Sequence, residues 1–452
     1  FIIFHSGNFW YFWNGFYVYL KKFHMKKILS FTLLLLSCFK LISQNDYYTE
    51  NYVRNQDFVY NENIKTVMLY KLGFELSAPV IALHSDEKLV LTFDDLSADY
   101  VKYEYTIIHC DADWNVSDLM PGDYLESFTD DYIDDFAYSV NTMQSYVNYR
   151  KIIPNDVISF KLSGNYLLKV YTENNPDQLI LTRRFFVVED KATVTGEVRM
   201  SSNVNERNWR QEVNCMVNTT GLTIIDPYQE IKLTIRQNGR WDNSITGIKP
   251  YQIRNNELFF NEIGSNVFDG GNGFRYFDIK TLRSNTMRVK MVDYDPVNGY
   301  QVYLHDDEIK KKHVYVDIQE NINGRYLIKT EDMPDARIQS EYATVNFFLS
   351  YPTPLIEGKL YVTGGLTNWQ LLREAEMKYN PARKGFEANL LLKQGFYNYQ
   401  YVLLPNNKKV ADLWFAEGNF YETNNEYTIY VYYRPQGSRY DQLVNVTMIL
   451  AH

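Results

Sequence analysis

Short runs of tyrosine, phenylalanine and β-branched residues recur along this chain, with turn-forming residues between them. Aromatic residues make up 16% of the sequence, and tyrosine alone occurs 39 times. These residue types favour β-strands, and the chain has almost no long stretch of alanine, leucine, glutamate and lysine that would favour a helix. Strands at such short spacing are typical of immunoglobulin-like sandwiches. The sequence therefore predicts an all-β fold of tandem immunoglobulin-like β-sandwich domains.

The strand runs fall into three groups, which predict β-sandwich domains over residues 45–190, 191–325 and 330–452, the last of them an early-set immunoglobulin-like module. The charged Glu189-Asp190-Lys191 marks the first boundary. Strands are expected, in chain order, at residues 89–93, 101–108, 166–171, 184–188, 192–199, 211–217, 230–236, 275–279, 341–350, 359–363, 385–392, 395–404 and 427–433.

The N-terminal region indicates export. Two lysines follow Met25, and an apolar run of about a dozen residues leads to Ser43, which is the pattern of a secretory signal peptide over residues 25–43. The run is too short to span a bilayer core, which needs ~20 apolar residues. Residues 1–24 are interpreted as sequence upstream of the true start at Met25. Cleavage before Gln44 would release a soluble protein, whereas a loosely lipobox-like Leu35–Cys38 would make Cys38 a lipidated N-terminus.

Charge and cysteine content narrow the function further. Residues 1–43 hold five Lys/Arg and no Asp/Glu, so the processed chain has 41 basic and 55 acidic side chains and a net charge of −14. This acidic balance argues against binding to nucleic acid or to an anionic membrane. Cys110 and Cys215 fall in different predicted domains, so we expect two buried thiols and no disulfide framework.

Two acidic stretches could carry chemistry. The segment Asp111–Ser117 has the alternating oxygen pattern of a calcium loop but lacks the glycine at position 6 and the carboxylate at position 12, so an Asx-rich structural loop is expected. The next segment could be a paired-carboxylate hydrolase site or a solvated acidic surface; its acids are Asp118, Asp123, Glu126, Asp130, Asp131, Asp134 and Asp135. The histidines are scattered. We expect no enzyme, no metal and no cofactor.

The stretch Lys359–Trp369, with Gly395–Val402 after it, resembles the glycogen- and starch-binding module of the early-set immunoglobulin type. In that family an aromatic face stacks on sugar rings, so the resemblance implies a glycan platform made of Asn368, Trp369 and Tyr399. The family's lysine in the later strand is replaced here by Gln400. An exported carbohydrate-binding β-sandwich protein is therefore one open interpretation, and a purely structural module is the other.

Six longer phrases stand out along the chain, at residues 108–114, 163–170, 181–189, 226–231, 237–242 and 268–278. Together they resemble the plug protein of the type IX secretion system of Bacteroidetes. The resemblance implies a periplasmic, non-enzymatic protein that closes the inner mouth of the outer-membrane translocon barrel, which would be its partner. Trp114 and Trp241 lie inside these phrases, and we expect them to be core or interface anchors. Asp111 and Asp113 are candidates for contact with the partner.

Overall fold

The computed structural model describes residues 52–311 and 321–451, and Val53–His452 form one compact unit. The predicted upstream extension, the signal peptide, Cys38 and Gln44 lie outside the described residues. The strands of Val53–His452 form pairs of sheets around three apolar cores, so the predicted all-β fold of tandem sandwiches is confirmed. No helix among the described residues has the length and apolar character that crossing a membrane requires.

The first sandwich packs the sheet β1-β10-β9-β5-β6, with β3 beside β10, against the sheet β2-β4-β8-β7. In β5, Tyr103, Tyr105 and Ile107 are buried while the residues between them are partly exposed, as expected of a strand with one face in the core. Its elements are β1 (Phe58–Val59), β2 (Ile64–Lys71), β3 (Val80–Ala82), β4 (Leu89–Asp95), β5 (Tyr103–Cys110), α2 (Pro121–Tyr124), β6 (Asp130–Tyr132), β7 (Asp135–Tyr138), β8 (Val147–Ile153), β9 (Gly164–Thr172) and β10 (Asn175–Val188).

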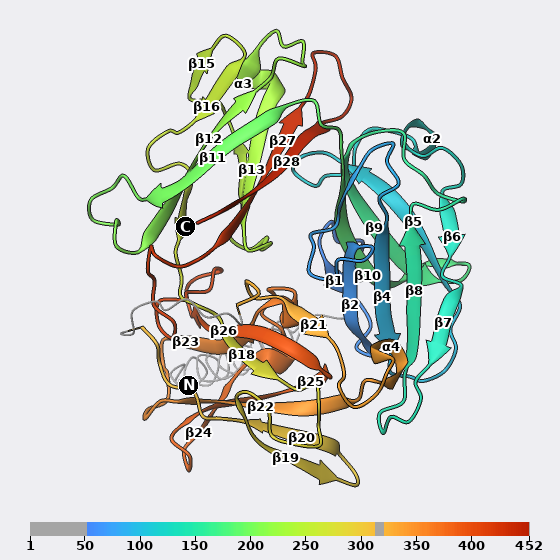
Figure 1. Ribbon diagram of the computed structural model, residues 1–452, viewed down its shortest axis with the longest axis vertical. Helices are drawn as coiled ribbons and strands as arrows, with labels where there is room; N and C mark the ends of the chain where they lie inside the picture. Colours follow the sequence, from blue (N-terminus) through green and yellow to red (C-terminus); the bar gives the residue numbers. More distant parts are fainter. Residues whose placement is uncertain (1–51, 312–320, 452) are drawn as a thin grey trace, which may run out of the picture. The chain divides into compact units, whose positions relative to one another are not determined.

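The second sandwich packs β11-β12-β16-β15, with β17 beside β12, against β14-β13-β27-β28. Its last two strands come from the C-terminal end of the chain, and Figure 1 shows these red strands beside the green β11 to β13. Its elements are β11 (Thr193–Met200), β12 (Arg210–Asn218), α3 (Pro227–Glu230), β13 (Ile231–Gln237), β14 (Ile245–Ile248), β15 (Gln252–Arg254), β16 (Glu257–Phe260), β17 (Val267–Asp269), β27 (Glu426–Tyr433) and β28 (Gln442–Leu450).

The third sandwich packs β18-β26-β21, with β23 beside β26, against β19-β20-β22-β25-β24. Its elements are β18 (Arg275–Asp278), β19 (Val289–Asp295), β20 (Gly299–Leu304), β21 (Tyr326–Ile328), α4 (Ala336–Gln339), β22 (Tyr342–Ser350), β23 (Gly358–Thr363), η1 (Gly365–Thr367), η2 (Arg373–Ala375), β24 (Lys378–Asn380), β25 (Gly385–Lys393) and β26 (Gly395–Pro405).

Strand pairing differs from the predicted boundaries at two places. β18 to β20, predicted in the second domain, pair with β26 and β22 of the third sandwich. β27 and β28, predicted in the third domain, complete the second sandwich because β27 pairs along all of β13. Spacing along the chain reports only local order, while these pairs join segments far apart in sequence. The second sandwich is therefore built from residues 192–269 together with the C-terminal segment.

Two buried tyrosines of the third core donate their hydroxyl groups to one buried carboxylate. Tyr399 and Tyr401 are buried on β26, and their hydroxyl groups donate to the Asp307 carboxylate at 2.6 Å and 2.8 Å. That carboxylate also pairs with Arg275 at 2.9 Å. A buried tyrosine needs a partner for its hydroxyl group, and this ionic centre provides one. The predicted pair of buried thiols is also confirmed, since Cys110 and Cys215 are free and buried.

Candidate functional site

The predicted anchors Trp114 and Trp241 meet at the junction of the first and second sandwiches. Their rings pack edge to face with centroids 5.3 Å apart, and Trp114 is 5% exposed. Phe186 of β10 joins them and stacks on Tyr430 of β27 at 4.4 Å. We call this apolar cluster the tryptophan junction; its core residues are Cys110, Ala112, Trp114, Leu167, Phe186, Val188, Tyr430, Tyr432 and Leu443, with Trp241 packed against them. Trp114 thus anchors an interface within the chain.

Two arginines pack on the tryptophan junction. The guanidinium carbon of Arg184 lies 4.5 Å from the ring centroids of both Trp114 and Trp241. That of Arg236 lies 3.8 Å from the centroid of Trp241. Both distances are within the range of cation–π attraction. Burial lowers the pKa of Arg184 to about 10, against the opposing effect of Asp57, so its side chain stays protonated at neutral pH.

The predicted Asx-rich loop is present and positions Trp114. Oδ1 of Asp111 accepts the backbone N–H groups of Asp113 and Asn115, each at 2.9 Å. Trp114 adopts φ 67° within this turn. Asp113 faces Lys232 of the second sandwich at 3.9 Å. In residues 52–311 and 321–451, no group of His, Cys, Asp and Glu is arranged to hold a metal ion. Asp111 thus holds the turn that positions Trp114, and Asp113 lies opposite Lys232 of the second sandwich.

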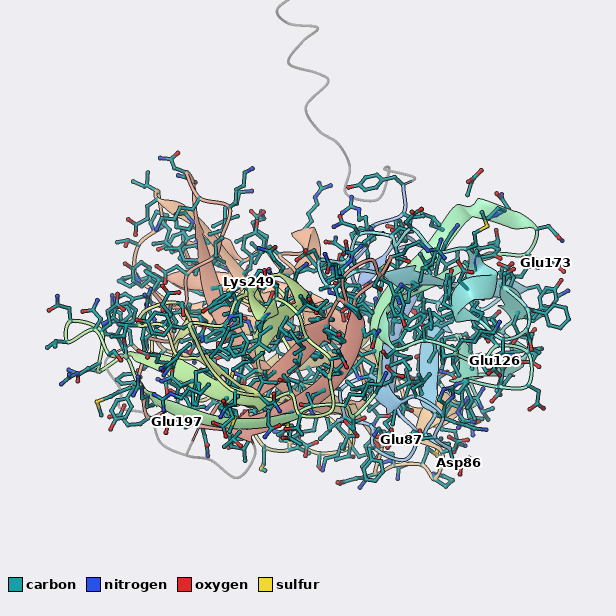
Figure 2. The ribbon with its side chains drawn as sticks, turned by 90° about the horizontal axis from the view of Figure 1, so that it is seen from above. Asp86, Glu87, Glu126, Glu173, Glu197 and Lys249 are labelled. Carbon is teal, nitrogen blue, oxygen red and sulfur yellow. The ribbon has the colours of Figure 1, made fainter. Side chains whose placement is uncertain are left out.

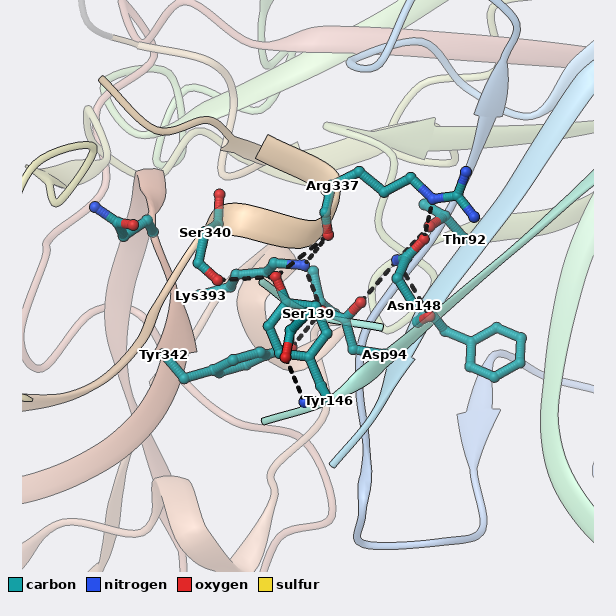
Figure 3. Close-up of polar contacts among 12 residues, drawn as sticks. Thr92, Asp94, Ser139, Tyr146, Asn148, Arg337, Ser340, Tyr342 and Lys393 are labelled. Carbon is teal, nitrogen blue, oxygen red and sulfur yellow. Dashed lines mark hydrogen bonds and ion pairs between the residues drawn. The ribbon is translucent and has the colours of Figure 1, made fainter. Parts of the chain in front are cut away.

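A buried ion pair joins the first sandwich to the third (Figure 3). Nζ of Lys393 on β25 lies 2.7 Å from Oδ2 of Asp94 on β4, and each side chain is 1% exposed. Tyr342 donates its hydroxyl group to Asp94 Oδ2 and Asn148 donates its amide to Asp94 Oδ1, both at 2.7 Å. Burial lowers the pKa of Lys393, while Asp94 opposes this shift. Fully buried charges are tolerated only with such complete pairing.

Further polar contacts between the first and third sandwiches surround the Asp94–Lys393 pair. Glu341 accepts the backbone N–H groups of Met143 and Gln144 from the first sandwich. Arg337 of α4 pairs with Asp135 at 2.7 Å. We call the group made of Asp94, Asn148, Arg337, Tyr342 and Lys393 the ionic lock. Two junctions, one apolar and one ionic, therefore connect the first sandwich to the other two.

The acidic segment after the Asx loop lies at an edge of the first sandwich, and basic side chains or hydroxyl groups bind most of its carboxylates. Asp123 pairs with Arg439 at 2.9 Å, and Asp131 and Asp134 both pair with Lys151 at 2.9 Å. The hydrogen bond from Lys151 lowers the pKa of Asp134, which is opposite to the shift that a general acid needs. Figure 2 shows Glu126 of this segment on the outside of the first sandwich. Lys151 therefore pairs with the two carboxylates that it brings together in this segment.

The three residues of the predicted glycan platform do not form one surface. Tyr399 is 1% exposed and points into the third core, where its hydroxyl group donates to Asp307. Trp369 packs against Phe274 with ring centroids 5.8 Å apart, and the guanidinium of Arg240 lies over its ring at 4.7 Å. Asn368 adopts φ 50° in the turn before it. Trp369 therefore packs structurally at the contact between the third and second sandwiches.

Sequence reasoning missed Arg184, Arg236, Asp94 and Lys393. One signal was present: Arg183 and Arg184 interrupt the apolar run 179–188 of a strand that the sequence predicts. An arginine in such a run must find a partner or an aromatic face inside the protein. Asp94 and Lys393 carry no such local signal, because they are 299 residues apart in sequence.

His109 is a buried histidine next to the tryptophan junction. It is 1% exposed, with Nδ1 at 2.9 Å from Ser117 Oγ. Burial lowers its pKa to about 4, and Asp441 and Asp111 oppose this only partly. In the unfolded chain its pKa would be about 6.5, so the unfolded state binds more protons between these values. The stability due to neutral His109 is complete above pH 6.5 and is lost as pH falls toward 4.

We expect the free energy of unfolding of the wild-type chain to fall by about 2 kcal/mol more than that of His109→Gln between pH 7.5 and pH 5. Urea titrations of both chains at a series of pH values measure this difference. His305→Gln, which replaces an exposed histidine, is the control and should keep the wild-type pH dependence. Equal pH dependence of the wild type and His109→Gln would contradict a buried neutral imidazole.

The chain is similar to known proteins over long stretches of sequence and structure. A family model described as the first domain of type 9 secretion system plug proteins matches residues 64–189, which hold most of the first sandwich, including Trp114 and Arg184. The crystal structure of a hypothetical protein from Parabacteroides merdae ATCC 43184 is 36% identical, with a TM-score of 0.84. This similarity covers 88% of this chain and 100% of that one. No curated protein matches the chain.

The family match thus contains the residues that the first sandwich contributes to the tryptophan junction, and the similar crystal structure covers most of the chain beyond it. Residues 64–189 of the chain are a first domain of the type 9 secretion system plug protein kind.

Proposed function

We propose that this chain closes the periplasmic mouth of the outer-membrane translocon barrel of the type IX secretion system. With the first domain of plug proteins over residues 64–189, the chain takes part in type IX secretion as an envelope-associated protein. Its specific role would be closure of the barrel, and its specific partner would be the barrel itself. In this role the chain is a physical barrier that leaves when cargo passes, and it performs no catalytic step.

One observation carries the proposal: the three sandwiches are fixed to one another by buried contacts. The tryptophan junction holds the first sandwich to the second, and the ionic lock holds it to the third. The C-terminal strands β27 and β28 also return to complete the second sandwich, so the chain closes on itself. A plug must keep its form against a wide aqueous pore, and sandwiches on free linkers would not do so.

Reversible docking suits the acidic surface. The processed chain has a net charge of −14, and polar contacts between charged surfaces form quickly and release easily. Exposed pairs are screened beyond a Debye length of ~10 Å at 0.1 M salt. Association with the barrel is therefore expected to weaken as salt rises. The glycan-binding alternative gains no support, because Tyr399 is buried and Trp369 packs on Phe274 and Arg240.

Deletion of this chain is expected to leave the barrel folded but open. A barrel wide enough to pass folded cargo cannot be sealed by its own side chains. Cells without the chain should therefore admit large polar dyes and antibiotics that intact cells exclude, as measured by dye uptake. Re-expression of the intact chain is the control and should restore exclusion.

Dependence on the channel makes this test specific. In a double deletion that also removes the barrel, the barrier should return, because no pore remains. Unchanged dye uptake in the single deletion, together with no co-purification with an outer-membrane barrel, would remove the plug assignment.

A further inference from the structure

A cleft of about 200 Å³ opens where residues of all three sandwiches meet. The first sandwich contributes part of β2, the 75–79 turn and two arginines of β10, and the second contributes the 236–241 turn with part of β27. The third contributes Arg325, Tyr326 and the turn that ends at Trp369. A volume of this size holds roughly seven water molecules at ~30 Å³ each, or one small organic ligand.

Three of the arginines that line this cleft make no ion pair within the described chain. Arg183, 5% exposed, donates to the backbone oxygens of Thr182 at 2.9 Å and Phe58 at 3.3 Å. Arg184 donates to the backbone oxygen of Asn55 at 2.8 Å. Arg236, 6% exposed, donates to the Arg240 oxygen and the Tyr430 hydroxyl group, each at 3.1 Å.

Carbonyl dipoles offset a buried guanidinium only in part, and the carboxylate of Asp57 acts on Arg183 and Arg184 without forming an ion pair with either side chain. The stacking on Trp241 described above also holds Arg184 and Arg236 in fixed positions. Nε and one terminal nitrogen of Arg184 already donate to the Asn55 oxygen, and each nitrogen of Arg236 donates to one oxygen. The donors that remain for a carboxylate are the other N–H groups of their terminal nitrogens. The cleft therefore presents rigid donors that an anion can use.

The charges around the cleft select the anion. Arg325 pairs with Glu426, and the remaining lining carboxylates are Asp57 and Glu75. Four arginines against three carboxylates leave one positive charge in excess. One negative charge on a ligand would balance the cleft, whereas a phosphate dianion would exceed the balance and be repelled by the lining acids. Met68, Leu76 and Pro79 add an apolar wall for the rest of the ligand.

We propose that this cleft binds a monocarboxylate carried on an apolar or aromatic body. The carboxylate contacts Arg184 and Arg236, and the body lies against the apolar wall of Met68, Leu76 and Pro79. This site goes beyond the plug role and does not rest on it. The ligand carboxylate can belong to a free organic acid or to the terminus of a polypeptide, and the experiment below separates these two sources.

The binding experiment follows tryptophan fluorescence of the full chain, because Trp241 and Trp369 line the cleft. The probes are 3-phenylpropionate, its neutral amide and inorganic phosphate. A charge-assisted hydrogen bond contributes ~1.5–3 kcal/mol, which corresponds to at least about tenfold in affinity. The carboxylate is therefore expected to bind at least about tenfold more tightly than the amide or phosphate. Acetyl-Ala-Ala-Phe with a free carboxylate, compared with its amidated form, tests the polypeptide source in the same way.

A gain-of-affinity variant avoids the risk that a core change unfolds the protein. Glu75 is an exposed acid at the cleft, and Glu75→Gln removes one repelling charge. We expect 3-phenylpropionate to bind to this variant about threefold to tenfold more tightly. Asp86→Asn is the matched control: Asp86 is an exposed acid of the same sandwich that does not line the cleft, and its replacement should leave affinity unchanged. Arg184→Gln should weaken binding at least about tenfold.

Binding of 3-phenylpropionate and the free-carboxylate peptide together supports the site with a polypeptide ligand, and binding of 3-phenylpropionate alone supports it with a small acid. Equal binding of acid and amide would overturn the proposal, as would tighter binding of phosphate than of 3-phenylpropionate. An affinity of Glu75→Gln no different from that of Asp86→Asn would also overturn it, whether or not Arg184→Gln folds.

Discussion

Replacing Asp94 by alanine is expected to lower the free energy of unfolding by about 3–5 kcal/mol. The change leaves the Lys393 ammonium buried without its carboxylate, and it removes the acceptor for Tyr342 and Asn148. An unpaired charge that is 1% exposed has no access to water, so the loss is larger than that of an ordinary hydrogen bond. Urea unfolding of wild type and variant, followed by circular dichroism, measures the difference.

A second substitution and a surface control complete this test. The double variant Asp94→Ala and Lys393→Met removes both charges, so it should recover part of the lost stability. Glu173→Ala breaks an exposed ion pair with Lys102 in the same sandwich and should leave the stability close to that of the wild type. If Asp94→Ala were as mild as Glu173→Ala, the ionic lock would not hold the first and third sandwiches together.

Trp114→Ala is expected to cost about 3–5 kcal/mol of stability, the usual range for removal of a buried tryptophan. The side chain fills the tryptophan junction between Phe186 and Trp241 and contacts Arg184. Its loss leaves a cavity at the contact between the first two sandwiches, and the guanidinium of Arg184 loses one of its aromatic faces. Unfolding should then separate into two transitions, with the first sandwich uncoupled from the second.

The exposed Trp414 offers a matched control for this second effect. Trp414 is 48% exposed, and Trp414→Ala should leave a single transition with nearly wild-type stability. Differential scanning calorimetry distinguishes one transition from two. A single transition at wild-type temperature for Trp114→Ala would show that the junction does not couple the sandwiches, and it would weaken the rigid-block argument for the plug role.

Much of the local structure follows from residue chemistry alone. Tyrosine-rich and β-branched runs form strands because their side chains fill a pleated surface, and most of the predicted runs are strands in the structure. Asp111 binds the backbone N–H groups two and four residues after it, which is a contact within one turn. The burial of both cysteines also follows from residue type. Each of these outcomes depends on neighbours close in the chain.

The assignment of strands to sandwiches, and the contents of the site, depend on contacts that no local pattern encodes. β27 is buried along its whole length because its two faces meet two different cores: Ile429 lies in the second core, and Tyr430 lies in the tryptophan junction. The same long-range packing pairs Lys393 with Asp94 and buries Tyr399 beneath the surface where a sugar platform was expected. Residue chemistry decides which segments become strands, while the burial of apolar area and charge among distant segments decides which strands pair and which side chains stay accessible.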